Sequence, residues 1–587
     1  MNTLFSELNF LFSETFKQNG YDETLGTISM SRRPDLCDFQ CNGALAGAKK
    51  CKKKPMEIAE EIVHSLESKK ETFKKIEAIN PGFINITLND DYLLNFLKRQ
   101  STSEELCVPQ SAKKKTIVID YGGPNVAKPL HVGHLRSAII GESLKRLAKA
   151  MGHNVISDVH LGDWGLQMGL VIAGLQEKHP ELQNNASFEM HTEGNFSSTF
   201  NLTAEELNEV YPYASKKSKE DPAFKSKADY ITCELQNGNP RYVGLWKKII
   251  ELSIGDLREN YAELGVEFDF WYGESDSAKY IGQLMERLEA KGLVYRSEGA
   301  LVVDVADPND TAPIPPVIVK KSDNSNIYAT TDLATIIQRQ EEFHPNEYWY
   351  VVDARQSLHF QQVFRCAYKA QLVDDTTKLE HLGFGTMNGK DGKPYKTRDG
   401  GVMRLSDFLN AVFNAAVSKE DLKNNNQSEI RKAKKISIAA IKFGDLSNHR
   451  LNNYIFDLNK FMAFEGKTGV YLLYTITRIN SLFKRCGITN EKFIYNSVFT
   501  PEERKLILTL ILSEESFIKA FDEREPCYVC ESAYSIATGF SEFYHNHSVI
   551  REENFEKKSS WLALCDIVRK YLIKHLEILG IEHVDSM

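Results

Sequence analysis

The segment KPLHVGHLRSAII, residues 128–140, holds two histidines three positions apart, with a glycine between them and a lysine just upstream. The β-branched run TIVIDY (116–121) precedes it and ends in the turn signal GGPN (122–125), which predicts a strand that stops there. Apolar residues after the histidines keep close to a helical period as far as Gly152, a residue suited to the position just past a helix end. The histidines are therefore expected where a strand gives way to a helix.

The alternation of strand and helix recurs along the chain. VISDV (155–159) predicts a second strand, and GDWGLQMGLVIAGL (162–175) predicts another helix. The pattern resumes later with a strand, a helix and a strand that leads into a basic, glycine-rich loop: YWYVVD (348–353), LHFQQVFRCAYKA (358–370), HLGFGTM (381–387) and NGKDGKPYKTRDGG (388–401). Two βα halves separated by an insertion predict a split, doubly wound α/β fold, in which nucleotides bind at the carboxyl ends of parallel strands.

The length of the chain predicts several domains, because 587 residues exceed what one hydrophobic core usually organises. Residues 1–110 predict a small, separate α/β domain. Residues 111–423 predict a Rossmann-like domain with an insertion at about 180–325, where the regular periodicity weakens. Residues 424–587 have few strand candidates and predict an all-α domain.

Composition and charge limit the class of protein. An apolar content of 42% without a long apolar run fits a soluble protein, and the first residues lack the features of a secretion signal, so a cytoplasmic location is expected. Ten cysteines with one CxxC pair, Cys527 and Cys530, predict buried thiols rather than disulfides or a zinc site. The net charge of -8 neither requires nor excludes a nucleic-acid partner, so any polyanion site must be a local patch.

The predicted strand-to-helix junction suits phosphate chemistry. Unpaired backbone N–H groups and the helix dipole favour an anion there by roughly 0.3–1 kcal/mol per charge, so side chains must supply the remaining affinity. His131 and His134 lie on the same side of the first helical turn, where each ring can donate a hydrogen bond to a triphosphate oxygen. Lys128 adds a mobile charge, and Gly133 leaves the backbone open to a flat base or ribose. The alternative is that one or both histidines only cap the helix or pack.

Longer segments around the histidines resemble a known family. VIDYGGPNVAKPLHVGHLRSAIIGESL (118–144) and VHLGDWGLQMG (159–169) are similar to the active-site block of class I aminoacyl-tRNA synthetases, and specifically of arginyl-tRNA synthetases. HVGH matches the HIGH motif of the class, while PNVAKP and GDWG are features of the arginine branch. The resemblance extends along nearly the whole chain, in FQCNGALAGAKK (39–50), YATTDLATI (328–336), DARQSLHFQQVF (353–364), FEGKTGVYLLYTITRI (464–479) and LEILGIEHVDSM (576–587).

The resemblance implies a function for each predicted domain: tRNA binding by residues 1–110, catalysis by 111–423 and anticodon binding by 424–587. It implies ligation of L-arginine to tRNA(Arg) through an arginyl-adenylate by a monomer, with ATP and Mg²⁺ as a substrate complex, no tightly bound cofactor and no protein-held metal. It also implies that arginine activation needs bound tRNA. Two other hypotheses are a nucleotidyltransferase that makes small-molecule adenylates and a non-catalytic RNA-binding paralogue. The additional domains argue against the first hypothesis, and the intact HVGH motif argues against the second.

The resemblance also implies which residues act on ATP. The implied set is His131, His134 and Lys128 as catalytic residues, with Val132, Gly133, Lys393, Lys396 and both histidines as ATP contacts. Many class I synthetases carry KMSKS in the second basic loop, whereas this chain has GKPYKTRDGG (392–401). Enzymes of the arginine branch that lack KMSKS typically have a lysine shortly before HIGH, a position that Lys128 occupies.

Five residues match the family's arginine pocket: Asp120, Asn125, Tyr328, Asp332 and Gln356. Asp332 is expected to hold the guanidinium, because a planar fork of donors is best met by a carboxylate that accepts in its plane. Asn125 suits the α-amino and carboxylate end of the substrate. Each position has a structural alternative: Asp332 as a helix N-cap, Asp120 as a turn cap, Tyr328 as a core residue and Gln356 as a helix cap.

Two further sets of contacts are expected. Gly162, Asp163 and Gln167, beside Trp164, are candidate adenosine contacts. Tyr471, Tyr474 and Arg478 are the expected tRNA-binding residues, because splayed bases stack on aromatic and guanidinium faces. The alternative for this aromatic stripe is that it packs in the core of the helical domain.

Overall fold

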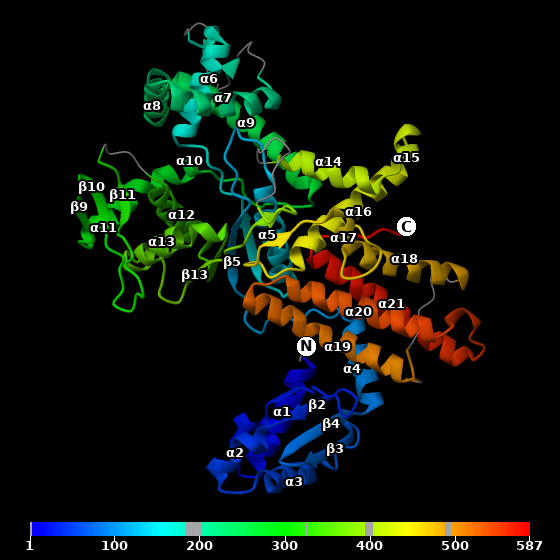
Figure 1. Cartoon of the computed structure of the whole chain (residues 1–587). Helices are drawn as coiled ribbons and strands as arrows, with labels where there is room; N and C mark the ends of the chain where they lie inside the picture. Colours follow the sequence, from blue (N-terminus) through cyan, green and yellow to red (C-terminus); the bar gives the residue numbers. More distant parts are fainter. Residues whose placement is uncertain are drawn as a thin grey trace. The chain divides into compact units, whose positions relative to one another are not determined.

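A computed structural model of the chain describes residues 3–183, 189–190, 196–197, 202–322, 327–393, 403–487, 495–498 and 500–587 (Figure 1). The chain divides into two units, which are Met1–Ala112 with Ala463–Ile578 and Glu582–Met587, and Lys113–Met462 with Leu579–Ile581. Each unit contains its own β-sheet.

Four parallel strands form the main sheet of the second unit, in the order β13 (Lys378–His381), β12 (Glu347–Val351), β5 (Thr116–Tyr121) and β6 (Asn154–Asp158). Ile117, Val118 and Ile119 of β5 are buried on both faces, as is typical of a central strand in a parallel sheet that helices cover. The predicted doubly wound α/β class and the strands predicted from TIVIDY, VISDV and YWYVVD are therefore confirmed.

The prediction of a strand over residues 381–387 is wrong in its bounds. β13 ends at His381, and the chain then leaves the sheet so that Met387–Asn388 (β14) pairs with Tyr454–Ile455 (β15). Gly385 permits this departure, because a Cβ there would lie 2.6 Å from Oδ1 of Asn453. A close approach between distant segments, rather than a continued strand, therefore explains the glycines of this stretch.

Helices pack around the parallel sheet. They are α5 (Val132–Ala150), which follows β5, α12 (Tyr328–Phe343), which precedes β12, and α13 (Ser357–Lys369), which follows it. One hydrophobic core joins β5, β12, α12 and α13 and includes Val118, Tyr348, Leu333 and Val363. The N-terminus of α5 consequently lies at the carboxyl end of β5, as the sequence predicts.

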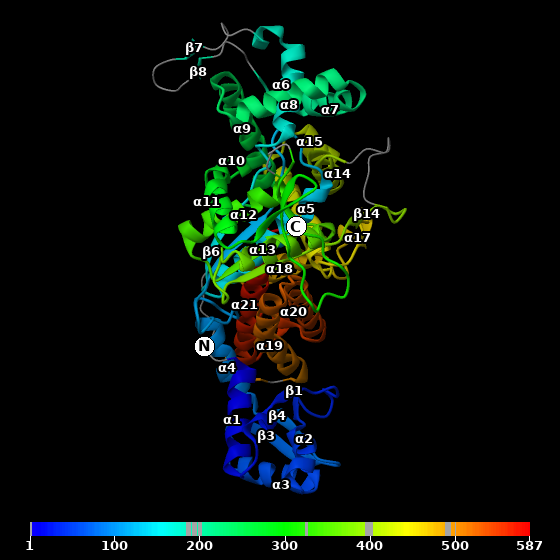
Figure 2. The ribbon, with the colours of Figure 1, turned by 90° about the vertical axis from the view of Figure 1, so that its left-hand side faces the viewer.

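The insertion between the two halves is mainly helical. Figure 2 shows α6 (Leu166–Lys178) with α7 (Ala204–Glu220), α8 (Pro222–Gln236) and α9 (Pro240–Glu263), and α6 packs against the other three. β7 (Glu189–Met190) and β8 (Phe196–Ser197) pair with each other, so this stretch adds no layer to the parallel sheet. The sequence analysis did not anticipate the next elements: α10 (Glu274–Ser277), α11 (Ile281–Ala290), and an antiparallel sheet of β9 (Val294–Ser297), β10 (Ala300–Val303) and β11 (Val317–Lys320).

Four helices complete the second unit: α14 (Leu405–Ala416), α15 (Lys419–Lys423), α16 (Gln427–Leu446) and α17 (Leu458–Phe461). α16 packs against α5 and α14, and its Asp445 accepts a hydrogen bond of 3.0 Å from the buried guanidinium of Arg136. The chain leaves this unit after Met462. The functional boundary expected at residue 424 stays a prediction.

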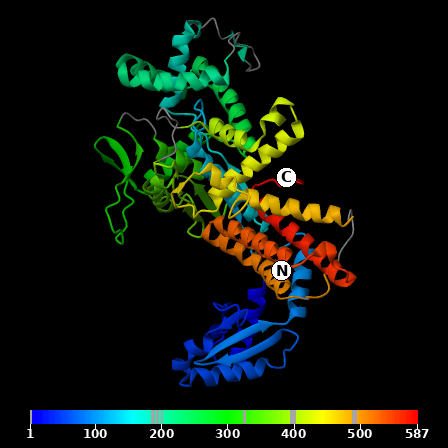
Figure 3. The ribbon, with the colours of Figure 1, turned by 45° about the vertical axis from the view of Figure 1, so that its right-hand side comes forward.

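The first unit combines a small α/β part with a helical part. The α/β part contains α1 (Leu4–Gln18), β1 (Ile28–Met30), β2 (Phe39–Cys41), α2 (Gly43–Cys51), α3 (Pro55–Leu66), β3 (Phe73–Ile79), β4 (Phe83–Leu88) and α4 (Asp90–Thr102), with an antiparallel sheet in the order β1-β2-β4-β3. The helical part contains α18 (Gly469–Arg485), α19 (Pro501–Glu523), α20 (Cys527–Asn546) and α21 (Phe555–Ile578), which lie side by side in Figure 3. The predicted N-terminal α/β part and helical C-terminal part are confirmed.

Cys527 and Cys530 are buried, as predicted, whereas Cys233 is exposed and Cys51 and Cys486 are half-buried. Burial raises the pKa of the Cys527 thiol to about 12. Within the described ranges, no helix combines the length and apolar character needed to cross a membrane.

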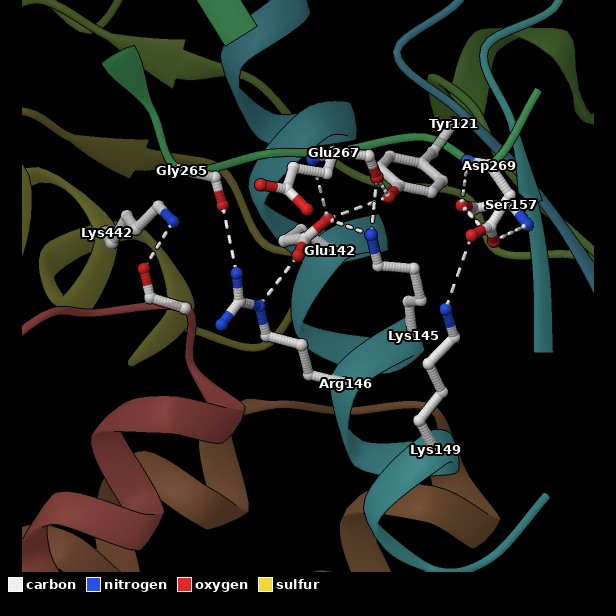
Figure 4. A network of polar contacts seen from close by, with 11 residues as sticks. Tyr121, Glu142, Lys145, Arg146, Lys149, Ser157, Gly265, Glu267, Asp269 and Lys442 are labelled. Carbon is white, nitrogen blue, oxygen red and sulfur yellow. Dashed lines mark hydrogen bonds and ion pairs between the residues drawn. The ribbon is translucent and has the colours of Figure 1, made fainter. Parts of the chain in front are cut away.

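A buried polar network fixes α5 to the segment that follows α9 (Figure 4). The Glu142 carboxylate accepts hydrogen bonds from the Tyr121 hydroxyl at 2.8 Å, Arg146 Nε at 2.7 Å and the Glu267 backbone N–H at 3.2 Å, and it pairs with Lys145 Nζ at 2.7 Å. Both Glu142 and Lys145 are buried. The ionised form of Glu142 is favoured, since these cations lower its pKa in spite of its burial.

Replacing Glu142 by Gln leaves the Lys145 ammonium buried without its anion. We expect Glu142→Gln to lower the free energy of unfolding of this unit by about 3–5 kcal/mol, the usual cost of breaking a buried ion pair. Urea unfolding followed by circular dichroism measures the loss. Glu251→Gln is the matched control, because the Glu251 side chain is 72% exposed in its pair with Lys248 and should change stability by less than about 1 kcal/mol. Equal stability of the two variants would contradict this account of the network.

Candidate active site

The first turn of α5 brings His131 and His134 together. His131 is the N-cap residue, and its Nδ1 accepts the Gly133 N–H at 3.0 Å. His134 Nδ1 accepts the His131 N–H at 3.1 Å, and the two ring centroids lie 4.0 Å apart. Because both Nδ1 atoms accept, each neutral ring carries its proton on Nε2. The histidines therefore cap the helix, as the structural alternative proposed, and each still has an Nε2–H to donate.

Electrostatics keep both imidazoles uncharged. Burial, and then the nearby Lys128, lower the pKa of His131. Burial lowers the pKa of His134 to about 3, with smaller contributions from His131 and Lys128. Near neutral pH the site thus offers two neutral N–H donors, and positive charge for a phosphate must come from other groups, such as Lys128.

Gly133 makes room for the ring of His131. A Cβ at position 133 would lie 2.7 Å from Cε1 and 2.8 Å from Nδ1 of His131. The glycine is therefore required by the capping geometry, a reason that the sequence analysis did not identify. Contact of this backbone with a base or ribose stays a prediction.

The residues that follow the basic, glycine-rich loop lie at the N-terminus of α5. The Val132 N–H donates to the Met403 carbonyl at 3.1 Å, and the Leu405 N–H donates to the Leu130 carbonyl at 2.9 Å. Lys393 is exposed, and its backbone N–H donates to Asp391 at 3.1 Å. Lys396 lies outside the described residues. This pairing places Met403 and Leu405 beside the histidines.

Lys128 lies where the insertion meets the active-site segment. Its Nζ is 5.8 Å from the centroid of the Tyr211 ring on α7. The neighbouring Ala127 N–H donates to Ser253 Oγ on α9 at 3.1 Å. Asn125 pairs through its backbone with Gly162 at the end of the β6 segment. The predicted Lys128 and Asn125 therefore belong to one structured loop that α7 and α9 support.

The predicted arginine-binding residues on α12 and α13 are accessible rather than structural. Asp332 is not the N-cap of α12, a position held by Ile327, and its Oδ2 accepts a hydrogen bond from His359 Nε2 at 2.5 Å. Tyr328 is 71% exposed and is not a core residue. Gln356 occupies the N-cap position of α13 without making a side-chain capping bond. Their roles toward arginine stay predictions.

Asp120 takes part in a buried clamp. Nη2 of Arg339 lies 2.7 Å from an oxygen of Asp120 and 2.7 Å from an oxygen of Asp158, so it links the ends of β5 and β6. Burial raises the pKa of Asp120, while Arg339 opposes that shift. The clamp accounts for Asp120 without a ligand, and its predicted contact with arginine is untested.

Glu274 is a further carboxylate that the sequence analysis missed. It begins α10, and its N–H donates to the Leu161 carbonyl at 3.0 Å, which brings it beside the end of the β6 segment. Burial raises its pKa to about 7; His160 opposes the shift, while Asp163 and Asp332 add to it. The signal available in the sequence was the aromatic run FDFWYG directly before an acidic residue. Glu274 and Asp332 therefore lie close enough for their charges to interact.

The candidate adenosine contacts have structural partners. Asp163 accepts hydrogen bonds from the Ser275 N–H at 3.0 Å and from its hydroxyl at 2.6 Å. Gln167 donates to the Val126 carbonyl. The Trp164 ring packs edge-on against Trp246, with centroids 5.2 Å apart. These contacts hold the loops around the site and leave the adenosine roles untested.

The predicted tRNA-binding residues lie on α18 in the first unit. The Tyr471 hydroxyl hydrogen bonds with Ser541 Oγ on α20 at 2.9 Å, and the guanidinium of Arg478 lies 4.2 Å from the Tyr544 ring centroid. Tyr474 is 41% exposed. Tyr471 and Arg478 thus pack on α20, and Tyr474 has the open face that base stacking needs.

A parallel sheet with paired histidines at the helix after its first strand is typical of class I aminoacyl-tRNA synthetases. Three family models match the chain: "tRNA synthetases class I (R), catalytic domain" over residues 97–458, "DALR anticodon binding domain" over 472–587 and "Arginyl tRNA synthetase N terminal domain" over 7–88. The chain therefore belongs to the arginyl-tRNA synthetases.

Individual relatives are similar to this chain over their full lengths. The chain is 45% identical to proteins named arginine–tRNA ligase from Alkaliphilus oremlandii and Agathobacter rectalis, with 100% of each chain covered. Among solved structures, it is similar to the arginyl-tRNA synthetases of Plasmodium falciparum, with a TM-score of 0.81 and 24% identity, and of Thermus thermophilus, with 0.77 and 19%. Both structures cover 100% of the chain and support the fold.

The close contact between Gly133 and His131 gives a direct test of the histidine geometry. Gly133→Ala must displace the His131 ring, and we expect kcat for arginyl-tRNA formation to fall by about 100-fold, the cost of a misplaced catalytic group. Gly255→Ala is the matched control, because nothing lies within 4 Å of a Cβ at that helical position. If Gly133→Ala retains wild-type kcat, the position of the His131 ring is not important for the reaction.

Proposed function

We propose that this chain joins L-arginine to tRNA(Arg) at the expense of ATP, in two steps. The arginine carboxylate attacks the α-phosphorus of ATP, so that an arginyl-adenylate forms and pyrophosphate leaves. A hydroxyl of the terminal ribose of tRNA then attacks the arginyl carbonyl, and AMP leaves. The observation that supports this proposal best is the pair of neutral Nε2–H donors of His131 and His134 at the helix terminus.

The residues of the site have different roles in the first step, the formation of the arginyl-adenylate. The two imidazoles donate to phosphate oxygens on which charge develops, and the Lys128 ammonium supplies the positive charge that neutral imidazoles lack. Lys128 thereby takes the role of the missing KMSKS lysine. Mg²⁺ arrives with ATP, since it binds phosphates with few protein ligands. No general base is needed, because the attacking carboxylate is already ionised.

Specificity for arginine comes from two carboxylates. Asp332 and Glu274 present acceptors to a planar guanidinium, while Asn125 and Gln356 meet the α-amino and carboxylate end. Tyr328 covers the same pocket from the first turn of α12. Lysine, with a compact ammonium, cannot satisfy two separate carboxylates through a fork of donors.

The N-terminal and C-terminal regions bind the tRNA. We assign tRNA binding to residues 1–110, catalysis to 111–423 and anticodon binding to 424–587, where Tyr474 offers an exposed aromatic face beside Tyr471 and Arg478. The protein acts as a monomer in the cytoplasm. The matches to an N-terminal and an anticodon-binding family model support these assignments.

Aminoacylation tests the function directly. Total tRNA is incubated with ATP, Mg²⁺ and each of several labelled amino acids, so that the tRNA needed for activation is always present. We expect arginine alone to be charged, with rates at least about 100-fold lower for His134→Ala, which removes one phosphate donor, and for Asp332→Ala. If tRNA binds but no amino acid is charged, the chain is a non-catalytic RNA-binding protein.

The raised pKa of Glu274 predicts a pH-dependent KM for arginine. Its carboxyl is protonated below about pH 7 and ionised above it, so the pocket holds a cation better at high pH. We expect KM for arginine to rise by about tenfold from pH 8 to pH 6, one pKa unit below the midpoint. KM for ATP serves as the internal control, and Glu274→Gln should make KM for arginine independent of pH over this range. An equally steep profile in Glu274→Gln would assign the titration to another group.

A further inference from the structure

His359 contacts the carboxylate that is proposed to hold the guanidinium. It lies in the first turn of α13, and its Nε2 is 2.5 Å from Oδ2 of Asp332 on α12. The side chains are 28% and 23% exposed, so the pair is partly open to solvent and does not lie in the core. His359 lies within DARQSLHFQQVF (353–364), a segment that resembles the family but by itself assigns no role to this histidine.

The direction of the hydrogen bond follows from the chemistry of its partners. An ionised carboxylate only accepts, so the imidazole must donate its Nε2–H to Asp332. Among the described residues, none donates to the other oxygen, Oδ1. The contact therefore fixes the orientation of the carboxylate and leaves one oxygen for a ligand.

Packing holds the histidine ring in place. The His359 ring meets Phe360 edge-on, with centroids 5.4 Å apart, and Phe360 stacks on His381 at 4.7 Å and lies 5.1 Å from Tyr350 of β12. An aromatic layer that reaches the parallel sheet thus restrains the donor. A restrained donor can in turn restrain the carboxylate that it binds.

We propose that His359 is a positioning residue that sets the preference of the pocket for arginine over lysine. Its Nε2–H holds Asp332 so that Oδ1, together with the Glu274 carboxylate, accepts from a planar guanidinium. This inference rests on the proposed function of the site. His359 does not touch the reacting atoms, and it acts through Asp332.

The different shapes of a guanidinium and an ammonium explain why the orientation of the Asp332 carboxylate matters more for arginine than for lysine. A guanidinium presents its donors in a rigid plane, so a rotated carboxylate loses hydrogen bonds to it. An ammonium is a compact charge with rotatable donors and tolerates many orientations of an anion. Loss of the His359 hydrogen bond should therefore weaken arginine binding and spare lysine binding.

The test compares variants that keep or remove the donor. His359→Phe retains a ring against Phe360 but has no N–H, whereas His359→Gln places an amide N–H near the position of Nε2. The readouts are kcat and KM for arginine in tRNA charging, KM for ATP, and the inhibition constant of L-lysine as a competitor of arginine. His359→Leu provides a second donor-free variant if the phenylalanine variant does not fold.

We expect His359→Phe to raise KM for arginine by about 10- to 100-fold, by analogy with the loss caused when the hydrogen-bond partner of a metal ligand is removed. The inhibition constant of lysine and KM for ATP should stay at wild-type values, and His359→Gln should restore most of the arginine affinity. A parallel loss of arginine and lysine binding would overturn the proposal, and so would an unchanged or lowered KM for arginine. If the wild type charges no arginine at all, the proposed function itself fails.

Discussion

The N-terminus of α5 imposes the constraint on which the active site depends. A helix terminus leaves backbone N–H groups without partners, and this helix satisfies two of them with the Nδ1 atoms of His131 and His134. The same bonds fix both tautomers, so two Nε2–H groups become donors. Helix capping and the proposed phosphate binding thus depend on one arrangement, and Gly133 is needed because the His131 ring lies over it.

Buried charges hold the elements that carry this arrangement. Arg339 joins the ends of β5 and β6 through Asp120 and Asp158, and Glu142 joins α5 to the segment that leads to Glu274. The proposed donors for ATP and the proposed acceptors for arginine therefore belong to one connected framework within the second unit. Breaking a buried ion pair lowers stability more than breaking an exposed one, so substitutions within this framework should disturb stability and activity together.

The sequence predicted most of the fold where local patterns are strong. Strands such as TIVIDY and the helix after HVGH follow from periodicity and turn signals, and the class follows from the resemblance around the histidines. It could not predict contacts between distant segments, namely the end of β13 at His381 or the bond between His359 and Asp332. Glu274 was missed because tertiary contacts, which include the pairing of Leu161 with Gly273, bring α10 to this part of the sheet. Asp120 matches a position of the family's arginine pocket in the sequence, whereas in the structure it accepts a hydrogen bond from Arg339.

The protonation of the two histidines is the most direct test of this account. Nitrogen-15 chemical shifts of labelled histidine, assigned with His131→Gln and His134→Gln, report the tautomer and charge of each ring. The account predicts neutral rings protonated at Nε2 at pH 7, with no titration of His134 between pH 5 and pH 8, because burial lowers its pKa to about 3. A proton on Nδ1, or a charged imidazolium at pH 7, would contradict it.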